Sequence, residues 1–287
     1  MNEYEIAGIR LRLNHQYPDF FRNNIEAYRL PLGATVKYQI DVDVTSVFPV
    51  PQGRERIARL MRRVYESDLE RTIVIDEKDD TTFVKQTITT SLDYKHTVIR
   101  INPNYGKRLA EIEYLATGMV FFDIAVAEGL LPIHAAAIEH QGSAILFAAP
   151  SGTGKSTHAA LWRMYCDNVK IINDDKPLIG MDGEILTVFG TPWSGKDVKN
   201  ENIYVPLKAI VFLKQSIENR IVELDREAAL KHLFRNVYRP RDSHQTEKAL
   251  EVMTDILLET DVVEFQTDVS EAAFRMIYAR LYGGKKA

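Results

Sequence analysis

The chain has 287 residues, enough for one large domain or for a small domain joined to a larger one. Apolar residues make up 45% of the chain and charged residues 26%, which is the usual balance of a soluble globular protein. The net charge is -4, without the basic surplus of a nonspecific nucleic-acid binder, so we expect no nucleic-acid partner. The single cysteine, Cys166, excludes an intrachain disulfide and a cysteine-rich zinc site.

Neither the first residues nor the most apolar stretch of the chain predicts a targeting or membrane segment. The first residues, MNEYEIAG, contain no basic segment that leads into an apolar run, so we expect no secretory signal. The most apolar stretch is Leu115–Ile133, and Asp123 and Glu128 interrupt it. Acidic residues are costly inside a bilayer, which favours a buried helix over a membrane span. We therefore expect a cytoplasmic protein with no membrane partner.

Short β-like runs separated by polar turns dominate the first hundred residues. The predicted strands are Tyr4–Leu13, Thr35–Val44, Arg71–Ile75, Thr82–Thr90 and His96–Ile101. One helix is predicted over Gly53–Ser67, because Ile57, Leu60, Met61 and Val64 recur at helical spacing. We predict a small N-terminal α+β domain with an antiparallel sheet over residues 1–105.

A compact series of strands and helices follows, which predicts an α/β domain of mixed type over residues 106–287. A long helix is expected over Lys107–Leu130. The predicted strands are Ile133–Glu139, Ser143–Ala149, Val169–Asn173, Pro177–Met181, Glu184–Phe189, Leu207–Leu213, Arg220–Leu224 and Val262–Gln266. The predicted helices are Lys155–Tyr165, Asp225–Asn236, Thr246–Glu259 and Val269–Tyr282.

A glycine-rich loop joins an apolar strand to a helix in the second part of the chain. Its sequence, Ala149-Pro-Ser-Gly-Thr-Gly-Lys155-Ser156, fits the Walker A pattern except that alanine occupies the first glycine position. Glycines allow positive φ, so successive N–H groups can surround a phosphate at the positive end of the helix. We therefore predict that ATP and Mg²⁺ bind here, with Lys155 on the terminal phosphates and Ser156 on the metal. The predicted nucleotide-binding residues are Pro150, Ser151, Gly152, Thr153, Gly154, Lys155, Ser156 and Thr157.

Two acidic residues and a histidine are candidates for the chemistry beside this loop. Asp174 and Asp175 follow the apolar strand Val169–Asn173, where a carboxylate commonly reaches the metal of a phosphate loop. One carboxylate could hold Mg²⁺ while the other accepts a proton from an attacking hydroxyl, and a plain polar turn is the alternative. His134 begins the strand before the one that enters the loop, and a purely structural histidine is the alternative there.

These motifs resemble a known family. His134-Ala, Ser151-Gly-Thr-Gly-Lys-Ser156 and Asp174-Asp175 are similar to the catalytic domain of HPr kinase/phosphorylase and to ATP-type phosphoenolpyruvate (PEP) carboxykinases. The resemblance covers residues 131–215 and implies a PEP carboxykinase/HPr kinase-like P-loop domain. It implies that Asp174 is the catalytic base, that Asp175 is a metal ligand and that His134 lies beside the reacting phosphate. It also implies a homo-oligomer, because relatives in that family form hexamers.

The loop Gly190–Lys196 is a further candidate, because loops on a rigid scaffold tend to carry sites. Lys196 could neutralise a transferring phosphoryl group and Trp193 could stack on a substrate, so Trp193, Ser194 and Lys196 are candidate substrate contacts. The sequence of the loop also resembles a group of short PEP-carboxykinase-like kinases. The alternative is a surface loop with a packed tryptophan. Near Pro240, a basic cluster of Arg235, Arg239 and Arg241 is either a phosphate clamp or a solvated helix end.

Together these motifs predict a Mg-ATP-dependent kinase that phosphorylates a serine-type hydroxyl of a peptide, protein or small molecule. One alternative is a non-catalytic ATP-binding sensor that acts through a partner. The stretch Thr187–Lys196 favours this alternative, since it has no carboxylate where HPr kinases carry a metal-binding glutamate. Phosphorolysis at the same site is a third interpretation.

Overall fold

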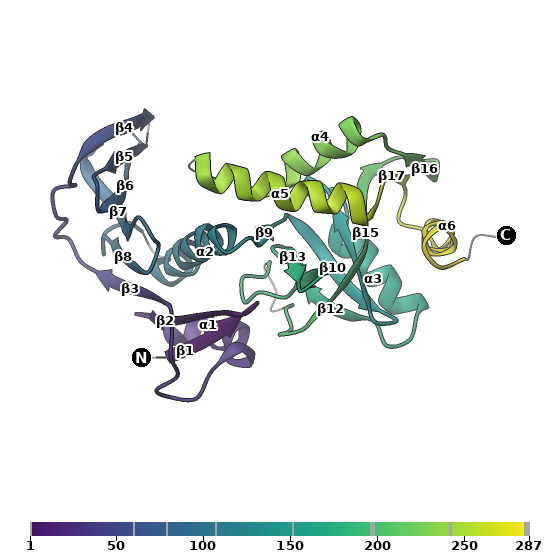
Figure 1. Cartoon of the computed structure of the whole chain (residues 1–287), viewed down its shortest axis with the longest axis horizontal. Coiled ribbons are helices and arrows are strands. Elements are labelled where there is room, and N and C mark those ends of the chain that lie inside the picture. Colours follow the sequence, from purple (N-terminus) through teal and green to yellow (C-terminus); the bar gives the residue numbers. More distant parts are fainter. Residues whose placement is uncertain are drawn as a thin grey trace. The chain divides into compact units, whose positions relative to one another are not determined.

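The structure is a computed structural model of the chain, and it describes residues 2–59, 61–78, 80–106, 108–150, 152–195, 199–240 and 243–283. The chain divides into two compact units, residues 1–124 and 125–287. The described residues form two mixed sheets and six α-helices, so the predicted mixed α/β class is confirmed. Helix α2 (Leu109–Ala127) contains the boundary between the units (Figure 1).

The first unit is built on an eight-stranded sheet with the order β1-β2-β3-β8-β7-β6-β5-β4. Its strands are β1 (Asn2–Ile6), β2 (Ile9–Asn14), β3 (Tyr38–Val44), β4 (Arg54–Arg59), β5 (Arg62–Glu66), β6 (Glu70–Glu77), β7 (Asp80–Ser91) and β8 (His96–Ile101). The prediction of an antiparallel sheet was wrong at its centre, since β3 is parallel to both β2 and β8. Parallel neighbours need a crossover connection, and the unpredicted helix α1 (Pro18–Ile25) with the short 3₁₀ helix η1 (Glu26–Tyr28) lies between β2 and β3.

The helix predicted over Gly53–Ser67 was also wrong, because β4 and β5 form an antiparallel hairpin there. Ile57 pairs with Val64 across this hairpin, and both Ile57 and Met61 remain exposed. The apolar residues at helical spacing therefore do not form one buried face. The pairing of β5 with β6 stabilises a strand there instead of a helix. Leu60, the fourth residue of the expected face, lies outside the described residues.

The second unit contains one branched sheet with the path β12-β10-β11-β15-β14-β13-β9, and β17 pairs with both β15 and β16. Its strands are β9 (Leu131–Pro132), β10 (Ala135–His140), β11 (Ser143–Ala148), β12 (Lys170–Asn173), β13 (Leu178–Asp182), β14 (Ile185–Phe189), β15 (Tyr204–Gln215), β16 (Arg220–Glu223) and β17 (Asp261–Thr267). Its further helices are α3 (Lys155–Tyr165), α4 (Arg226–Asn236), α5 (Ser243–Glu259) and α6 (Glu271–Tyr282). β11 is parallel to β15, and β15 is parallel to β17.

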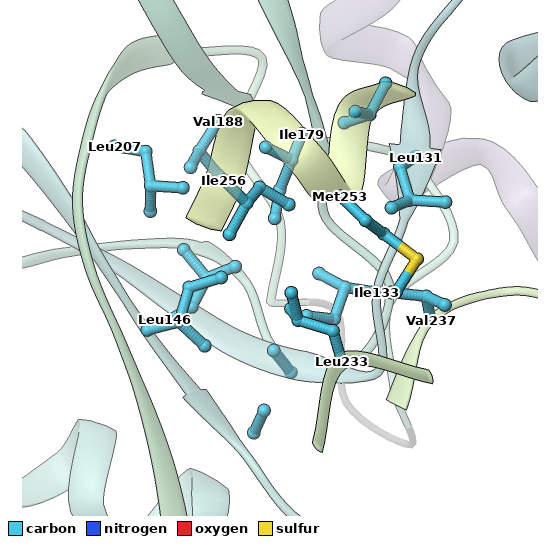
Figure 2. Close-up of a cluster of buried hydrophobic side chains, with 14 of the residues drawn as sticks. Leu131, Ile133, Leu146, Ile179, Val188, Leu207, Leu233, Val237, Met253 and Ile256 are labelled. Carbon is cyan, nitrogen blue, oxygen red and sulfur yellow. The ribbon is translucent and has the colours of Figure 1, made fainter. Parts of the chain in front are cut away.

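Helices cover both faces of the second sheet, and Figure 1 shows α4 and α5 on one side of its strands and α3 on the other. The β11 run is apolar throughout because its alternate side chains enter two different cores. Leu146 packs with Leu233 of α4 and Met253 of α5 in the core drawn in Figure 2. Phe147 packs with Trp162 of α3 in the opposite core. The strand that enters the glycine-rich loop is thus fixed on both faces.

The apolar helix α2 is a buried helix of the fold, and Phe121 and Ile124 are fully enclosed. Among the residues that the structure describes, no helix combines the length and the apolar character needed to span a bilayer.

Candidate functional site

The glycine-rich loop connects β11, which ends at Ala148, to α3, which begins at Lys155. Gly152 and Gly154 adopt φ values of 82° and 106°, a region that favours glycine over other residues. No atom would meet a Cβ within 4 Å at either glycine, so the backbone conformation is what requires glycine here. Ser151, predicted as part of the loop, lies outside the described residues. The strand–loop–helix arrangement expected from the sequence is therefore present.

The ammonium group of Lys155 lies inside this loop, and the residue is only 8% exposed. Its Nζ donates to the carbonyl oxygen of Ala149 at 2.9 Å and approaches that of Pro150 at 3.4 Å. Burial lowers the pKa of the Lys155 ammonium below its ordinary value, although the nearby Asp175 carboxylate acts in the opposite direction. Because a buried ammonium with few strong hydrogen-bond acceptors is stabilised by a nearby negative charge, this position favours the binding of an anion.

His134 connects Lys155 to Asp175. The Nε2 atom of His134 lies 3.0 Å from Lys155 Nζ, and its Nδ1 lies 2.8 Å from Asp175 Oδ1. An ammonium can only donate, so Nε2 is placed to accept from Lys155, while Nδ1 lies between the Asp175 carboxylate and the Lys176 Nζ, which is 3.0 Å away. Lys176 pairs with the second carboxylate oxygen of Asp175 at 3.1 Å. The structure thus brings His134 and Asp175 together at the loop, as the sequence led us to expect.

The two adjacent carboxylates have opposite electrostatic environments. Burial raises the pKa of Asp174, outweighing the hydrogen bond that the Gly195 N–H donates to Asp174 Oδ1 at 2.6 Å. Burial also acts to raise the pKa of Asp175, but the hydrogen bond from His134 and the charge of Lys176 lower it to about 2. Asp174 is therefore the better proton acceptor near neutral pH, and Asp175 stays ionised.

A cavity of about 460 Å³ joins these groups. It is lined by His134, Gly152, Gly154, Lys155, Ser156, Thr157, Asp174, Asp175, Gly195 and Lys199. Most of the predicted loop residues and all three predicted catalytic residues therefore face one space.

The oxygen atoms in this cavity suit Mg²⁺ bound together with a phosphate. Ser156, Asp174 and Asp175 supply a hydroxyl and two carboxylates, which are ligands that Mg²⁺ accepts. Across the described ranges, no group of three or more His, Cys, Asp or Glu residues is arranged to hold a metal by itself. Mg²⁺ usually takes one or two carboxylates plus phosphate oxygens and water, so this donor set fits it.

Sequence reasoning missed Asn173, the residue that ties the two sides of the cavity together. Its Oδ1 accepts hydrogen bonds from the N–H groups of Asp175 at 2.8 Å and Lys176 at 2.7 Å. Its Nδ2 donates to the carbonyl oxygens of Thr191 at 2.8 Å and Trp193 at 3.3 Å. This fully buried amide fixes the turn that carries both carboxylates against the loop after β14. An asparagine at a strand end, directly before two candidate aspartates, was the available signal.

The loop after β14 contributes other residues to the cavity than the predicted substrate contacts. Trp193 and Ser194 are buried, at 3% and 4% exposed, and neither lines the cavity. Gly195 does line it and donates to Asp174. Lys196 lies outside the described residues. The described part of this loop therefore positions Asp174 through its backbone and its packing.

The basic cluster lies at a different cavity, since Arg235 and Arg239 do not line the space around Lys155. Arg241 lies outside the described residues.

Comparison with known proteins bears on the family. The model of the family described as SynChlorMet cassette protein ScmC matches residues 99–249, slightly more than half of the chain. The chain belongs to the ScmC family. No curated protein matches the chain.

The family assignment corrects the resemblance drawn from the sequence. The identification with HPr kinase/phosphorylase and the PEP carboxykinases was wrong, because the matching family is ScmC. The motifs behind that resemblance, a short loop, a histidine and two aspartates, also occur together in this ScmC chain. A few shared residues of this kind indicate a similar site, but they do not establish which family a chain belongs to. The match includes the loop, His134 and both carboxylates.

Proposed function

We propose that this ScmC chain is a P-loop kinase that binds ATP with Mg²⁺ and transfers the terminal phosphoryl group to a hydroxyl. The observation that carries the proposal is that Lys155, Asp174 and Asp175 face one cavity at the loop between β11 and α3. Phosphoryl transfer depends on positioning, charge neutralisation and a base, and these residues supply a candidate for each.

The loop and Lys155 bind the polyphosphate. The positive end of α3 and the N–H groups around Gly152 and Gly154 favour an anion. A phosphate oxygen is a stronger acceptor than a peptide carbonyl, so it replaces the 3.4 Å contact between Lys155 and Pro150. Binding also restores the charge that burial disfavours on Lys155.

Asp174 acts as the base in this proposal. Its Oδ1 is held by the Gly195 N–H, which leaves Oδ2 to take the proton of the acceptor hydroxyl. The acceptor oxygen then forms its bond to the terminal phosphorus as the bond to ADP breaks. Burial raises the pKa of Asp174, which makes its carboxylate a stronger base than that of an ordinary aspartate.

Ser156 and Asp175 would hold Mg²⁺, which neutralises charge on the transferred group. His134 positions Asp175 through the 2.8 Å contact and accepts from Lys155, so it links the two ends of the site. Because the reaction uses ATP, we place it in the cytoplasm.

The test is incubation with γ-labelled ATP and candidate acceptors, followed by mass spectrometry. The family description calls ScmC a cassette protein, so products of the neighbouring genes are the first acceptors to try. We expect Lys155→Ala to abolish transfer, and Asp174→Asn to bind ATP without turnover. Asp182→Asn, the same change at the exposed last residue of β13, is the matched control and should transfer normally.

The outcomes separate the proposal from its two alternatives. Unchanged transfer in Lys155→Ala would refute the proposed mechanism, and full turnover in Asp174→Asn would refute the assignment of the base. ATP binding by the wild-type chain without any phosphorylated product would instead support a sensor module. Transfer of the phosphoryl group from an already phosphorylated acceptor to added inorganic phosphate, which yields the free hydroxyl and pyrophosphate, would without kinase activity support phosphorolysis.

A further inference from the structure

A second cavity of the same unit, about 500 Å³ in volume, lies between α4 and α5. We call it the α4–α5 groove. Its floor is apolar and buried, formed by Val237, Ala249 and Met253. Phe234 of α4 and Leu250 of α5 also line it and are 47% and 39% exposed, so both helices present an accessible apolar side chain to the same hollow.

The charges on the groove are of one sign. Lys231, Arg235 and Arg239 line it, and none of its described lining residues is acidic. Glu227 pairs with Lys231, whereas Arg235 and Arg239 form no ion pair with another residue that the structure describes. Arginine binds carboxylates with two parallel hydrogen bonds, so the rim complements an acidic segment more specifically than lysines would.

The groove adjoins the proposed active site through one stretch of backbone. The His134 N–H donates to the carbonyl oxygen of Asn236 at 2.7 Å, and Ile133 forms a bridge with Val237. His134 lines the loop cavity, whereas Val237 lines the groove. Paired strands lie about 4.8 Å apart, so a single strand pairing separates the two spaces.

We propose that the α4–α5 groove binds the acceptor, and that the acceptor is a peptide segment with an apolar side chain flanked by carboxylates. The apolar side chain packs between Phe234 and Leu250, and the carboxylates pair with Arg235 and Arg239. From this anchor the segment continues past the pairing of Ile133 with Val237 and places its hydroxyl at the loop cavity. The role as acceptor rests on the proposed kinase function, whereas the binding itself requires no nucleotide.

The test is selection of random twelve-residue peptides displayed on phage against the immobilised full-length chain without nucleotide. We expect enriched sequences in which Asp or Glu residues flank a large apolar residue. Labelled copies of these peptides are then titrated with the chain in solution, and binding is followed by fluorescence anisotropy. Arg235→Glu should weaken binding at least tenfold, which corresponds to about 1.4 kcal/mol.

Matched variants separate the groove from general effects of charge and folding. Arg226→Glu makes the same change at an exposed position of α4 outside the groove and should leave the affinity unchanged. Leu250→Gln tests the apolar anchor at an exposed position and should also weaken binding. Circular dichroism should show that all three variants remain folded. Lys155→Ala should bind the peptides as well as the wild type does.

Three results of the peptide experiments would overturn the proposal. They are no enrichment above background, enrichment of basic sequences, and equal affinity for the wild type and Arg235→Glu. A homodimer in sedimentation experiments that Arg235→Glu dissociates would also overturn it, since a second copy would then occupy the groove. Failure of ATP binding with intact peptide selection would refute only the kinase function, and the reverse pattern would refute only the groove.

Discussion

Replacing Asn173 by alanine should destabilise the second unit and loosen both sides of the proposed site. The side chain is fully buried at the end of β12. It accepts from the N–H groups of Asp175 and Lys176 and donates to the carbonyl oxygens of Thr191 and Trp193. Its Nδ2 also donates to Thr191 Oγ1 at 3.1 Å, and alanine removes all five hydrogen bonds without replacing them.

The expected cost follows from how many of these partners stay buried. Thr191 and Trp193 lie inside the fold, so their carbonyl oxygens lose a partner where water does not reach. The N–H groups of Asp175 and Lys176 are half-buried and regain some hydration. A buried group left without a partner costs about 1–3 kcal/mol, and an ordinary hydrogen bond about 1 kcal/mol. We expect Asn173→Ala to lose about 3–4 kcal/mol of unfolding free energy.

Urea unfolding followed by tryptophan fluorescence measures this loss. The chain has two tryptophans, and both Trp162 and Trp193 belong to the second unit, so the signal follows that unit alone. Thr254→Ala is a control, since this exposed side chain makes one helical hydrogen bond to the Leu250 carbonyl oxygen at 2.8 Å. It should change the unfolding free energy by less than about 0.5 kcal/mol.

Nucleotide affinity should fall in the same variant, because Asn173 holds the turn that carries Asp174 and Asp175. A loss of less than about 1 kcal/mol, with unchanged nucleotide affinity, would refute the view that this amide organises the site.

Three further predictions concern the charges and the close packing around the cavity. The low pKa of Asp175, about 2, should stabilise the fold by about 2 kcal/mol above pH 4, a contribution lost as the pH falls through 2. Urea unfolding at several pH values should show this dependence in the wild type but not in Asp175→Asn, and an identical dependence in both would contradict it. Gly190→Ala should cost more than about 3 kcal/mol, because its Cβ would overlap the Glu201 carbonyl oxygen. Gly142→Ala, where a Cβ meets nothing but φ is 75°, should cost only about 1 kcal/mol, and equal losses in the two variants would be inconsistent with crowding at Gly190. Lys155→Met should lower the melting temperature only slightly, because removal of a charge that burial disfavours offsets the lost hydrogen bonds to the Ala149 carbonyl oxygen and His134 Nε2, and a fall of several degrees would contradict this reading.

The central part of the second unit could be predicted from sequence because its signals are local. Continuous apolar runs predicted strands at the positions of β11 and β15, and the loop pattern predicted that α3 begins at Lys155. Asp174 and Asp175 were found because they follow a buried strand near that loop. Each of these inferences depends on residues that are close together in the chain.

The remaining features depend on partners distant in sequence. Asn173 joins two loops about twenty residues apart, and its place before two candidate aspartates does not reveal which distant carbonyl oxygens its side chain binds. The pairing of Ile133 with Val237, which places the α4–α5 groove beside the site, joins residues about a hundred positions apart. The hairpin of β4 and β5 had the spacing of a helix, and only its pairing with β6 determines its structure.

The central claim is that main-chain N–H groups around Gly152 and Gly154, together with Lys155, bind the phosphates of a magnesium nucleotide. Calorimetric titration of the full-length chain with Mg·ATP measures this directly, with Lys155→Ala as the matched variant. We predict binding at a single site in the wild type, abolished in the variant. At a hundredfold excess over Kd, bound nucleotide should also add about 2.7 kcal/mol of stability. No heat and no rise in melting temperature with any magnesium nucleotide would contradict the account.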